Sequence, residues 1–182
     1  ISDILARDSF IGFRLLAAER KDELSRRLAD TGFRLDTWDL FIGAKDDVLP
    51  PCTDIVGAPL PSGLQLLPMP DQPEGPYTAA IQSLIASAGV MPFSGSLLVA
   101  ALGRATTVVV GRAKEDLATA AHGYLPHNGS SAYHRHAWGG LVAVAEAYRG
   151  RGLGKFINAV LAVSVFRDLG ASYIYEMIST SN

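Results

Sequence analysis

A run of six residues near the end of the sequence has the composition of an anion-binding loop. It reads Arg149-Gly150-Arg151-Gly152-Leu153-Gly154 and is followed by Lys155. An apolar run that predicts a strand precedes it and a long apolar-periodic segment that predicts a helix follows, so backbone N–H groups would point outward at the positive end of the helix dipole. Glycines let an anion approach the backbone, and the basic side chains add charge. We therefore predict a phosphate site rather than a glycine-rich surface turn.

The segments on either side of this loop predict one strand–helix–strand unit. Trp138–Ala145 is expected to be a central strand, because Leu141–Ala145 is apolar without alternation and so requires cover on both faces of a sheet. Gly152–Leu169 carries a wide apolar surface, which predicts a long helix. Ala171–Ser179 then predicts a strand parallel to the first, as a crossover through a helix requires.

Helices and an antiparallel hairpin are expected upstream of the central strand. Tyr77–Ala88 and Ser94–Leu102 have apolar residues at helical spacing. Thr106–Gly111 and Leu117–Leu125 are β-branched and apolar on either side of a polar turn, which predicts a hairpin. A further short strand is expected at Leu64–Leu67. Together these segments predict two helices followed by an antiparallel pair of strands.

The first third of the sequence predicts a separate extension. Phe13–Asp30 suits an amphipathic helix and Phe33–Ile42 suits a strand. Pro50–Pro76 contains eight prolines and no helical period, so we expect an irregular connector there. The sequence therefore predicts a boundary between an N-terminal extension, residues 1–62, and a second domain, residues 63–182.

Composition excludes several classes of protein. The 182 residues are 48% hydrophobic and 19% charged with a formal net charge of −2, which fits a folded globular protein without an electrostatic preference for nucleic acid or an anionic membrane. The apolar stretches are too short for a membrane-spanning helix. Cys52 is alone, so an intrachain disulfide is impossible, and with a start that does not resemble a secretion signal this favours the cytoplasm.

Residues 142–154 resemble the GNAT superfamily of N-acetyltransferases. The family signature is Arg/Gln-x-x-Gly-x-Gly/Ala after a strand with an apolar-x-Val run, and here Val142-Ala143-Val144 precedes Tyr148 and the glycine loop. The resemblance extends over Gly63–Asn182. It implies an α/β (α+β) fold with a mixed, mostly antiparallel central sheet flanked by helices. The family's next helix and two closing strands are not in the chain, so we expect a C-terminally incomplete domain whose last strand has an exposed edge.

The resemblance also implies a cofactor and a reaction. Acetyl-coenzyme A (acetyl-CoA) would be the co-substrate, and its acetyl group would pass directly to a primary amine with the help of a general base. The residues implied in cofactor binding are Val142, Ala143 and Val144 for the pantetheine arm, and Arg149, Gly150, Arg151, Gly152, Leu153, Gly154 and Lys155 for the pyrophosphate, with Asn182 resembling a further contact. Glu146 and Glu176 are the candidate bases, and for each a solvated or locally paired carboxylate is the alternative.

No metal is expected. His122, His127, His134 and His136 cluster in the sequence, but no cysteine or acidic residue accompanies them at ligand spacing. One of them could instead act as a general base or bind substrate. The two tryptophan side chains, Trp38 and Trp138, are expected to anchor a core or an interface rather than to stack against a ligand.

The sequence narrows the choice of acceptor amine and of protein partner only in part. Tyr77–Leu102 and Gly123–His136, the segments expected on the substrate side, carry little charge apart from histidine, which disfavours polyamines and strongly acidic acceptors. Small-molecule amines, amino acids and peptide N-termini stay open. Residues 1–62 suit either a degenerate second GNAT-like half or a helical dimerisation or lid element, so a homodimer is a further expectation.

Two other functions compete with this interpretation. A dinucleotide-binding oxidoreductase would also place Gly150-x-Gly152 at a helix start and an acid such as Glu176 about 20 residues on. Against it, Lys155 stands where that fingerprint needs a small residue, and the preceding strands are expected to be antiparallel. A module that binds acyl-CoA without catalysis is the other alternative, because the general base is uncertain.

Overall fold

The computed structural model describes residues 18–29, 31–33, 35 and 37–179. It divides into two compact units, a smaller one that contains helix α2 (Ala18–Leu28) and Trp38, and a larger one that runs over residues 39–178. Helix α2 lies within the predicted helix Phe13–Asp30, of which residues 13–17 and 30 lie outside the described residues. The larger unit includes residues on both sides of the predicted domain boundary at residue 62. The boundary itself stays a prediction.

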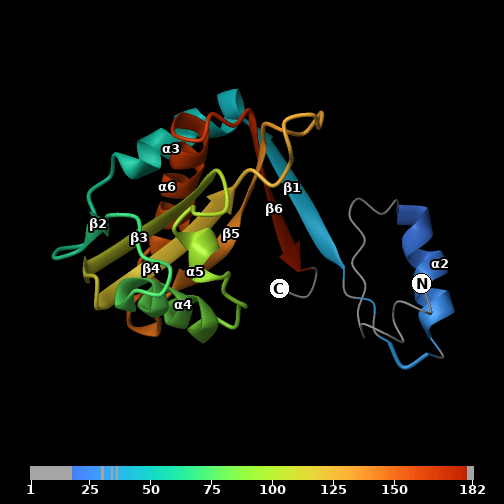
Figure 1. Ribbon diagram of the computed structural model, residues 1–182, viewed down its shortest axis with the longest axis horizontal. Coiled ribbons are helices and arrows are strands. Elements are labelled where there is room, and N and C mark those ends of the chain that lie inside the picture. The colour runs from blue at the N-terminus through green and yellow to red at the C-terminus, as the bar shows by residue number, and fades with distance from the viewer. Residues whose placement is uncertain (1–17, 30, 34, 36, 180–182) are drawn as a thin grey trace. The chain divides into compact units, whose positions relative to one another are not determined.

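A six-stranded sheet forms the centre of the larger unit (Figure 1). Strands β2 to β5 are antiparallel neighbours, whereas β5 and β6 are parallel, as the crossover through a helix predicts. The fold class predicted from the sequence, a mixed and mostly antiparallel sheet flanked by helices, is therefore confirmed. The strands, in the order in which they lie in the sheet, are β1 (Trp38–Ala44), β6 (Tyr173–Ser179), β5 (His136–Val144), β4 (Asp116–Tyr124), β3 (Ala105–Ala113) and β2 (Gln65–Leu67).

Helices cover both faces of this sheet (Figure 1). Helix α6 (Leu153–Arg167) packs on one face, and α3 (Lys45–Val56) packs against α6. Helices α4 (Pro76–Ser87) and α5 (Gly95–Leu98) lie on the other face. Side chains at alternate strand positions therefore enter two different cores, one with α6 and one with α4 and α5.

Helix α3 overturns the prediction that Pro50–Pro76 has no helical structure, whereas β2 agrees with the short strand expected at Leu64–Leu67. Pro50 and Pro51 lie inside this helix. Each proline removes one hydrogen bond of the helix, but the residues around them pack an apolar face against the α6 core and offset that loss. The side chains that do so include Val48, Leu49, Cys52, Ile55 and Val56. Tertiary packing, which periodicity alone does not report, decides the structure here.

The outer edge of β6 is also not exposed as predicted. Strand β1 lies beside it in the sheet. The N–H of Lys45, directly after β1, donates to the carbonyl of Ser172, directly before β6, at 2.9 Å. The end of β1 thus lies next to the start of β6, which is the arrangement of antiparallel neighbours. The N-terminal segment of the chain supplies the strand that the sequence analysis found lacking.

Two further expectations need correction in extent. The predicted helix Ser94–Leu102 is only one turn, α5, because Ala100 has a left-handed φ of 59° that ends it. Strand β5 is central, as predicted, but its cover is complete only at alternate positions, since Ala137 is buried and its neighbour Trp138 is half-buried. No helix in the part of the chain that the structure describes has the length and apolarity needed to cross a membrane.

Candidate functional site

The predicted anion loop lies between a 3₁₀ turn, η1 (Glu146–Tyr148), and the start of α6. Gly150 and Gly152 have left-handed φ values of 73° and 77°, and a Cβ atom added to either would meet nothing within 4 Å. Gly152 directly precedes the helix, so the amides of the first turn have no partner within it. Open backbone at the positively polarised end of a helix is therefore present where the sequence predicts an anion.

The side chains of this loop divide into two groups. Leu153 is 2% exposed, and a Cβ atom added at Gly154 would lie 3.6 Å from Val144 Cγ2, so these two residues offer backbone rather than side chain to a ligand. The basic residues Arg149, Arg151 and Lys155 are exposed. The Arg149 Nε donates to the Val144 carbonyl at 3.4 Å, and the Arg151 guanidinium lies 5.5 Å from the centre of the Tyr148 ring. Both arginines are thus oriented beside the loop while keeping donors in solvent.

Strands β5 and β6 separate before β5 reaches the glycine loop. Their pairing comprises His136–Tyr173, Ala137–Ile174 and Trp138–Tyr175, although both strands continue for several residues. Beyond Trp138, the edge of β5 that faces β6 has no ladder partner among the described residues. We call the space between the diverging strands the splay. A strand edge with unpaired backbone groups can accept an extended ligand as it would accept another strand.

A β-bulge lies at the point where the strands begin to diverge. On β4, Ala120 pairs with Ala143 and His122 pairs with Gly140, so two residues of β5 lie opposite one residue of β4 between these pairs. Leu141 absorbs the extra residue with a φ of 52°, a left-handed conformation that is uncommon for leucine. Sequence reasoning missed this strained position. The preceding glycine pair, Gly139 and Gly140, was its only local signal.

The residues predicted to hold the pantetheine arm lie on the splay side of this bulge. Ala143 is buried toward α4 and α5, and Val142 packs toward α6. Val144 faces Gly154 across the strand–helix junction. Their side chains are thus used in packing, which leaves only backbone groups for a ligand. This agrees with the backbone role that the resemblance implies for them, although the role itself stays a prediction.

The two predicted general bases are in different environments. Glu146 is exposed in η1, between β5 and the loop. Glu176 follows the last paired residue of β6 and faces α6, where its Oε2 accepts a hydrogen bond from Asn158 Nδ2 at 3.3 Å. Burial raises the pKa of the Glu176 carboxyl, and the Asn158 hydrogen bond offsets this in part. Burial and the charge of Glu176 together raise the pKa of the Cys52 thiol on α3. Glu176 is therefore half-buried on the side of the sheet that α6 and α3 cover, rather than in open solvent.

The histidines and Asn182 complete the predicted set. Asn182 lies outside the described residues. His127, Tyr133 and His136 form a chain of ring contacts at the start of β5, whereas His122 is fully buried on β4. Among residues 18–29, 31–33, 35 and 37–179, no group of three or more His, Cys, Asp or Glu side chains is arranged to hold a metal ion.

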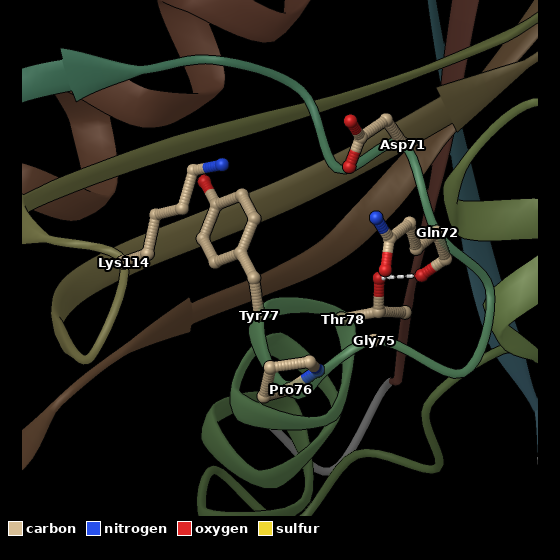
Figure 2. A pocket seen from close by; sticks show the side chains of 7 residues that line it. All are labelled: Asp71, Gln72, Gly75, Pro76, Tyr77, Thr78 and Lys114. Atoms are coloured by element: carbon tan, nitrogen blue, oxygen red, sulfur yellow. Dashed lines mark hydrogen bonds between the residues drawn. The ribbon is translucent and has the colours of Figure 1, made fainter.

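One cavity lies away from the splay, at the start of α4 (Figure 2). Figure 2 shows Lys114 beside the ring of Tyr77, whose hydroxyl donates to the Pro68 carbonyl at 2.9 Å. Burial raises the pKa of Tyr77 to about 12, which keeps this hydroxyl protonated. The cavity measures about 180 Å³, less than the roughly 300–1,000 Å³ of typical ligand pockets. We therefore place the candidate site at the splay and the loop.

No protein-family model matches the sequence, and no curated protein matches it at a significant level. Solved structures do match the fold. A GCN5-related N-acetyltransferase from Kribbella flavida has a TM-score of 0.57 at 15% identity, over 85% of this chain and 53% of its own. A tandem GNAT protein from the clavulanic acid biosynthesis pathway has a TM-score of 0.59 at 15% identity, over 94% of this chain and 54% of its own.

A third structure, a GCN5-related N-acetyltransferase from Sphaerobacter thermophilus, has a TM-score of 0.54 at 15% identity, over 91% of this chain and 49% of its own. The chain thus spans about half the length of these proteins. At such identities the likeness concerns the fold and not the chemistry. The chain thus has the fold of the GCN5-related N-acetyltransferases.

Proposed function

We propose that this chain binds acetyl-CoA along the splay and the glycine loop, and that the protein containing it transfers the acetyl group to a primary amine. The observation that carries this proposal is the continuity of two features. Strand β5 leaves its parallel neighbour after Trp138 and then leads directly into a loop with two left-handed glycines at the start of α6. An extended arm that ends in a pyrophosphate matches that sequence of features.

The residues of the chain suit each part of such a ligand. The unpaired edge of β5 beyond Trp138 offers backbone donors and acceptors to the amide groups of a pantetheine arm. Gly150 and Gly152 leave the backbone of the loop open to the pyrophosphate, and Arg149, Arg151 and Lys155 supply charge around it. When bound, acetyl-CoA supplies an acetyl group that is activated as a thioester.

The general base is the least constrained part of this proposal. Glu176 has a raised pKa, which suits a base that works near neutral pH, and it stands at the point where β6 leaves β5. Its carboxyl faces α6, however, so proton transfer from an amine on the α4 and α5 face would have to run through water in the splay. Glu146 is exposed, and its carboxylate has no hydrogen-bond or ion-pair partner within the described part of the chain that would orient it. We therefore propose Glu176, acting through water, as the base to test first.

Calorimetry with the full-length protein tests the cofactor. Acetyl-CoA should bind saturably, and a nicotinamide dinucleotide should not, because antiparallel β3, β4 and β5 lack the parallel strand–helix repeat of dinucleotide-binding folds. Binding of the dinucleotide alone would refute the proposal in favour of an oxidoreductase. Release of the free thiol of coenzyme A in the presence of amines then tests transfer. Saturable binding without transfer to any amine would identify a non-catalytic acyl-CoA module.

A further inference from the structure

Aromatic side chains gather on the face of the sheet that α4 and α5 cover, beside the end of the β5–β6 pairing. We propose that Tyr124, Trp138 and Tyr175, together with Phe93 above them, form the binding site for the acceptor, and that the acceptor is a primary amine carrying an aromatic group. We call these four side chains the aromatic row. The inference rests on the proposed function, because it names the substrate class of that same site.

Strand register places three of these rings side by side. Tyr124 pairs with Trp138 across β4 and β5, and Trp138 pairs with Tyr175 across β5 and β6. Residues that are paired in this way direct their side chains to the same face of a sheet. The Trp138–Tyr175 pair is also the last one before the strands diverge. The row therefore crosses the sheet at the apex of the splay, where the acyl end of a ligand lying along β5 would arrive.

Phe93 adds a fourth ring from the segment between α4 and α5. Its ring centre is 5.4 Å from that of Trp138 and 5.8 Å from that of Tyr124, in tilted and edge-on arrangements. All four side chains of the row are half-buried rather than sealed in the core. The Trp138 ring lies over Gly140, where a Cβ atom would come within 2.5 Å of it. Gly140 thus keeps a flat aromatic surface available at the bulge.

His122 supplies one polar group beneath these rings. The Thr107 hydroxyl donates to the Leu98 carbonyl at 2.6 Å, which can only accept, so at 2.8 Å the same oxygen accepts from His122 Nδ1–H. The proton is thereby fixed on Nδ1, and Nε2 holds a lone pair. That Nε2 is buried without a hydrogen-bond partner among the described residues, while the His122 ring contacts Phe93 and Tyr124. An N–H of a ligand would satisfy it.

The absence of charge on the covering helices decides between classes of amine. No residue between Glu74 and Arg104 is charged, and this range includes all of α4 and α5. A dicationic or acidic acceptor would therefore be desolvated there without an opposing charge, at a high free-energy cost. An aromatic amine gains ring contacts instead. An apolar surrounding also favours the uncharged amine, which is the form that attacks a thioester.

Acetyl transfer to a matched panel of amines tests the inference in the full-length protein. We expect kcat/KM for 2-phenylethylamine to exceed that for n-pentylamine by about tenfold, the scale of an aromatic contact. Putrescine and glutamate should be poorer than both. Trp138→Leu should reduce the preference for 2-phenylethylamine to less than about threefold, mainly through KM. Trp38→Leu, which removes the other, 59% exposed tryptophan, is the matched control and should leave the preference unchanged.

The outcomes separate the inference from the proposed function. Efficient transfer to n-pentylamine or putrescine without preference for the aromatic amine would overturn the inference. The proposed acetyltransferase function would be retained. If Trp138→Leu does not fold, as judged by circular dichroism, Tyr175→Leu takes its place. If no amine is acetylated, binding decides: in a Trp38→Phe protein, where Trp138 is the sole tryptophan of this chain, 2-phenylethylamine should quench the emission saturably and n-pentylamine should not. Equal or absent quenching would refute the aromatic site.

Discussion

The glycine before α6 offers a test of the proposed acetyl-CoA site at the glycine loop, in which charge is the sole variable. Gly152 has a φ of 77°, and an added Cβ would meet nothing within 4 Å. Asparagine and aspartate have the same shape, and both tolerate the left-handed region better than other residues with a side chain. Gly152→Asn and Gly152→Asp should therefore share a backbone cost of about 1 kcal/mol in the free energy of unfolding. Only the second variant adds a negative charge to the loop.

The difference between these two variants measures repulsion from a bound pyrophosphate. Coulomb's law gives roughly 1 to 3 kcal/mol for one pair of charges about 6 Å apart, at effective dielectric constants of about 20 to 60. The loop is exposed, so the lower end applies to each charge, and two phosphate charges give about 2 kcal/mol. Acetyl-CoA should then bind to Gly152→Asp about thirtyfold more weakly than to Gly152→Asn.

Calorimetry at two salt concentrations completes this test. The deficit of Gly152→Asp should shrink when the ionic strength rises from 0.05 to about 0.5 M, because the screening length then becomes comparable with the separation of the charges. Thermal melts should show that the two variants unfold at similar temperatures. Equal affinities of Gly152→Asn and Gly152→Asp for acetyl-CoA at low salt would show that no pyrophosphate approaches this glycine, and the loop would lose its assigned role.

Three further predictions concern buried groups. Burial lowers the pKa of His122 to about 4, so the folded state opposes protonation of this side chain. The free energy of unfolding should therefore fall by about 3 kcal/mol between pH 7 and pH 4, relative to that of a His122→Asn variant. Urea titrations in which the stability of both proteins changes equally with pH would contradict this. Thr107→Val leaves His122 Nδ1–H unsatisfied and should cost about 1–3 kcal/mol of stability in urea titration, whereas Thr107→Ser keeps the hydroxyl and should cost less. The charge of Glu176 helps to raise the pKa of Cys52, so Glu176→Gln should speed alkylation of this cysteine by iodoacetamide at pH 8; an unchanged rate would mean that the two groups are not coupled.

The parts of the fold that were predictable from sequence are those whose signal is local. The glycine loop, the helix after it and the next strand are each encoded by contiguous residues. In the structure the loop leads into α6, and the strand is β6. Helix α3 was not predictable in this way, because Pro50 and Pro51 oppose it locally and only its packing against α6 stabilises it. The left-handed Leu141 is similar, since nothing in a leucine indicates that a bulge will require it.

The aromatic row was equally hidden, for a different reason. Its members come from β4, β5, β6 and the segment before α5, and they meet only because of strand register. Sequence analysis identified Trp138 as an anchor of a core or an interface. Its half-buried ring at the apex of the splay supports a ligand-stacking role instead, which stays a proposal. Long-range register is the information that a single sequence lacks.

The splay itself depends on residues far from the loop in sequence. A strand that leaves one neighbour exposes backbone groups, and it stays extended only if another element holds it. Strand β6 has β1 on its other side, and α3, which follows β1, packs against α6. The segment Asp39–Val56 thus supports β6, the strand that lies across the splay from β5. The glycine loop and the splay are therefore specified by two distant parts of the chain, of which only the loop has a recognisable sequence pattern.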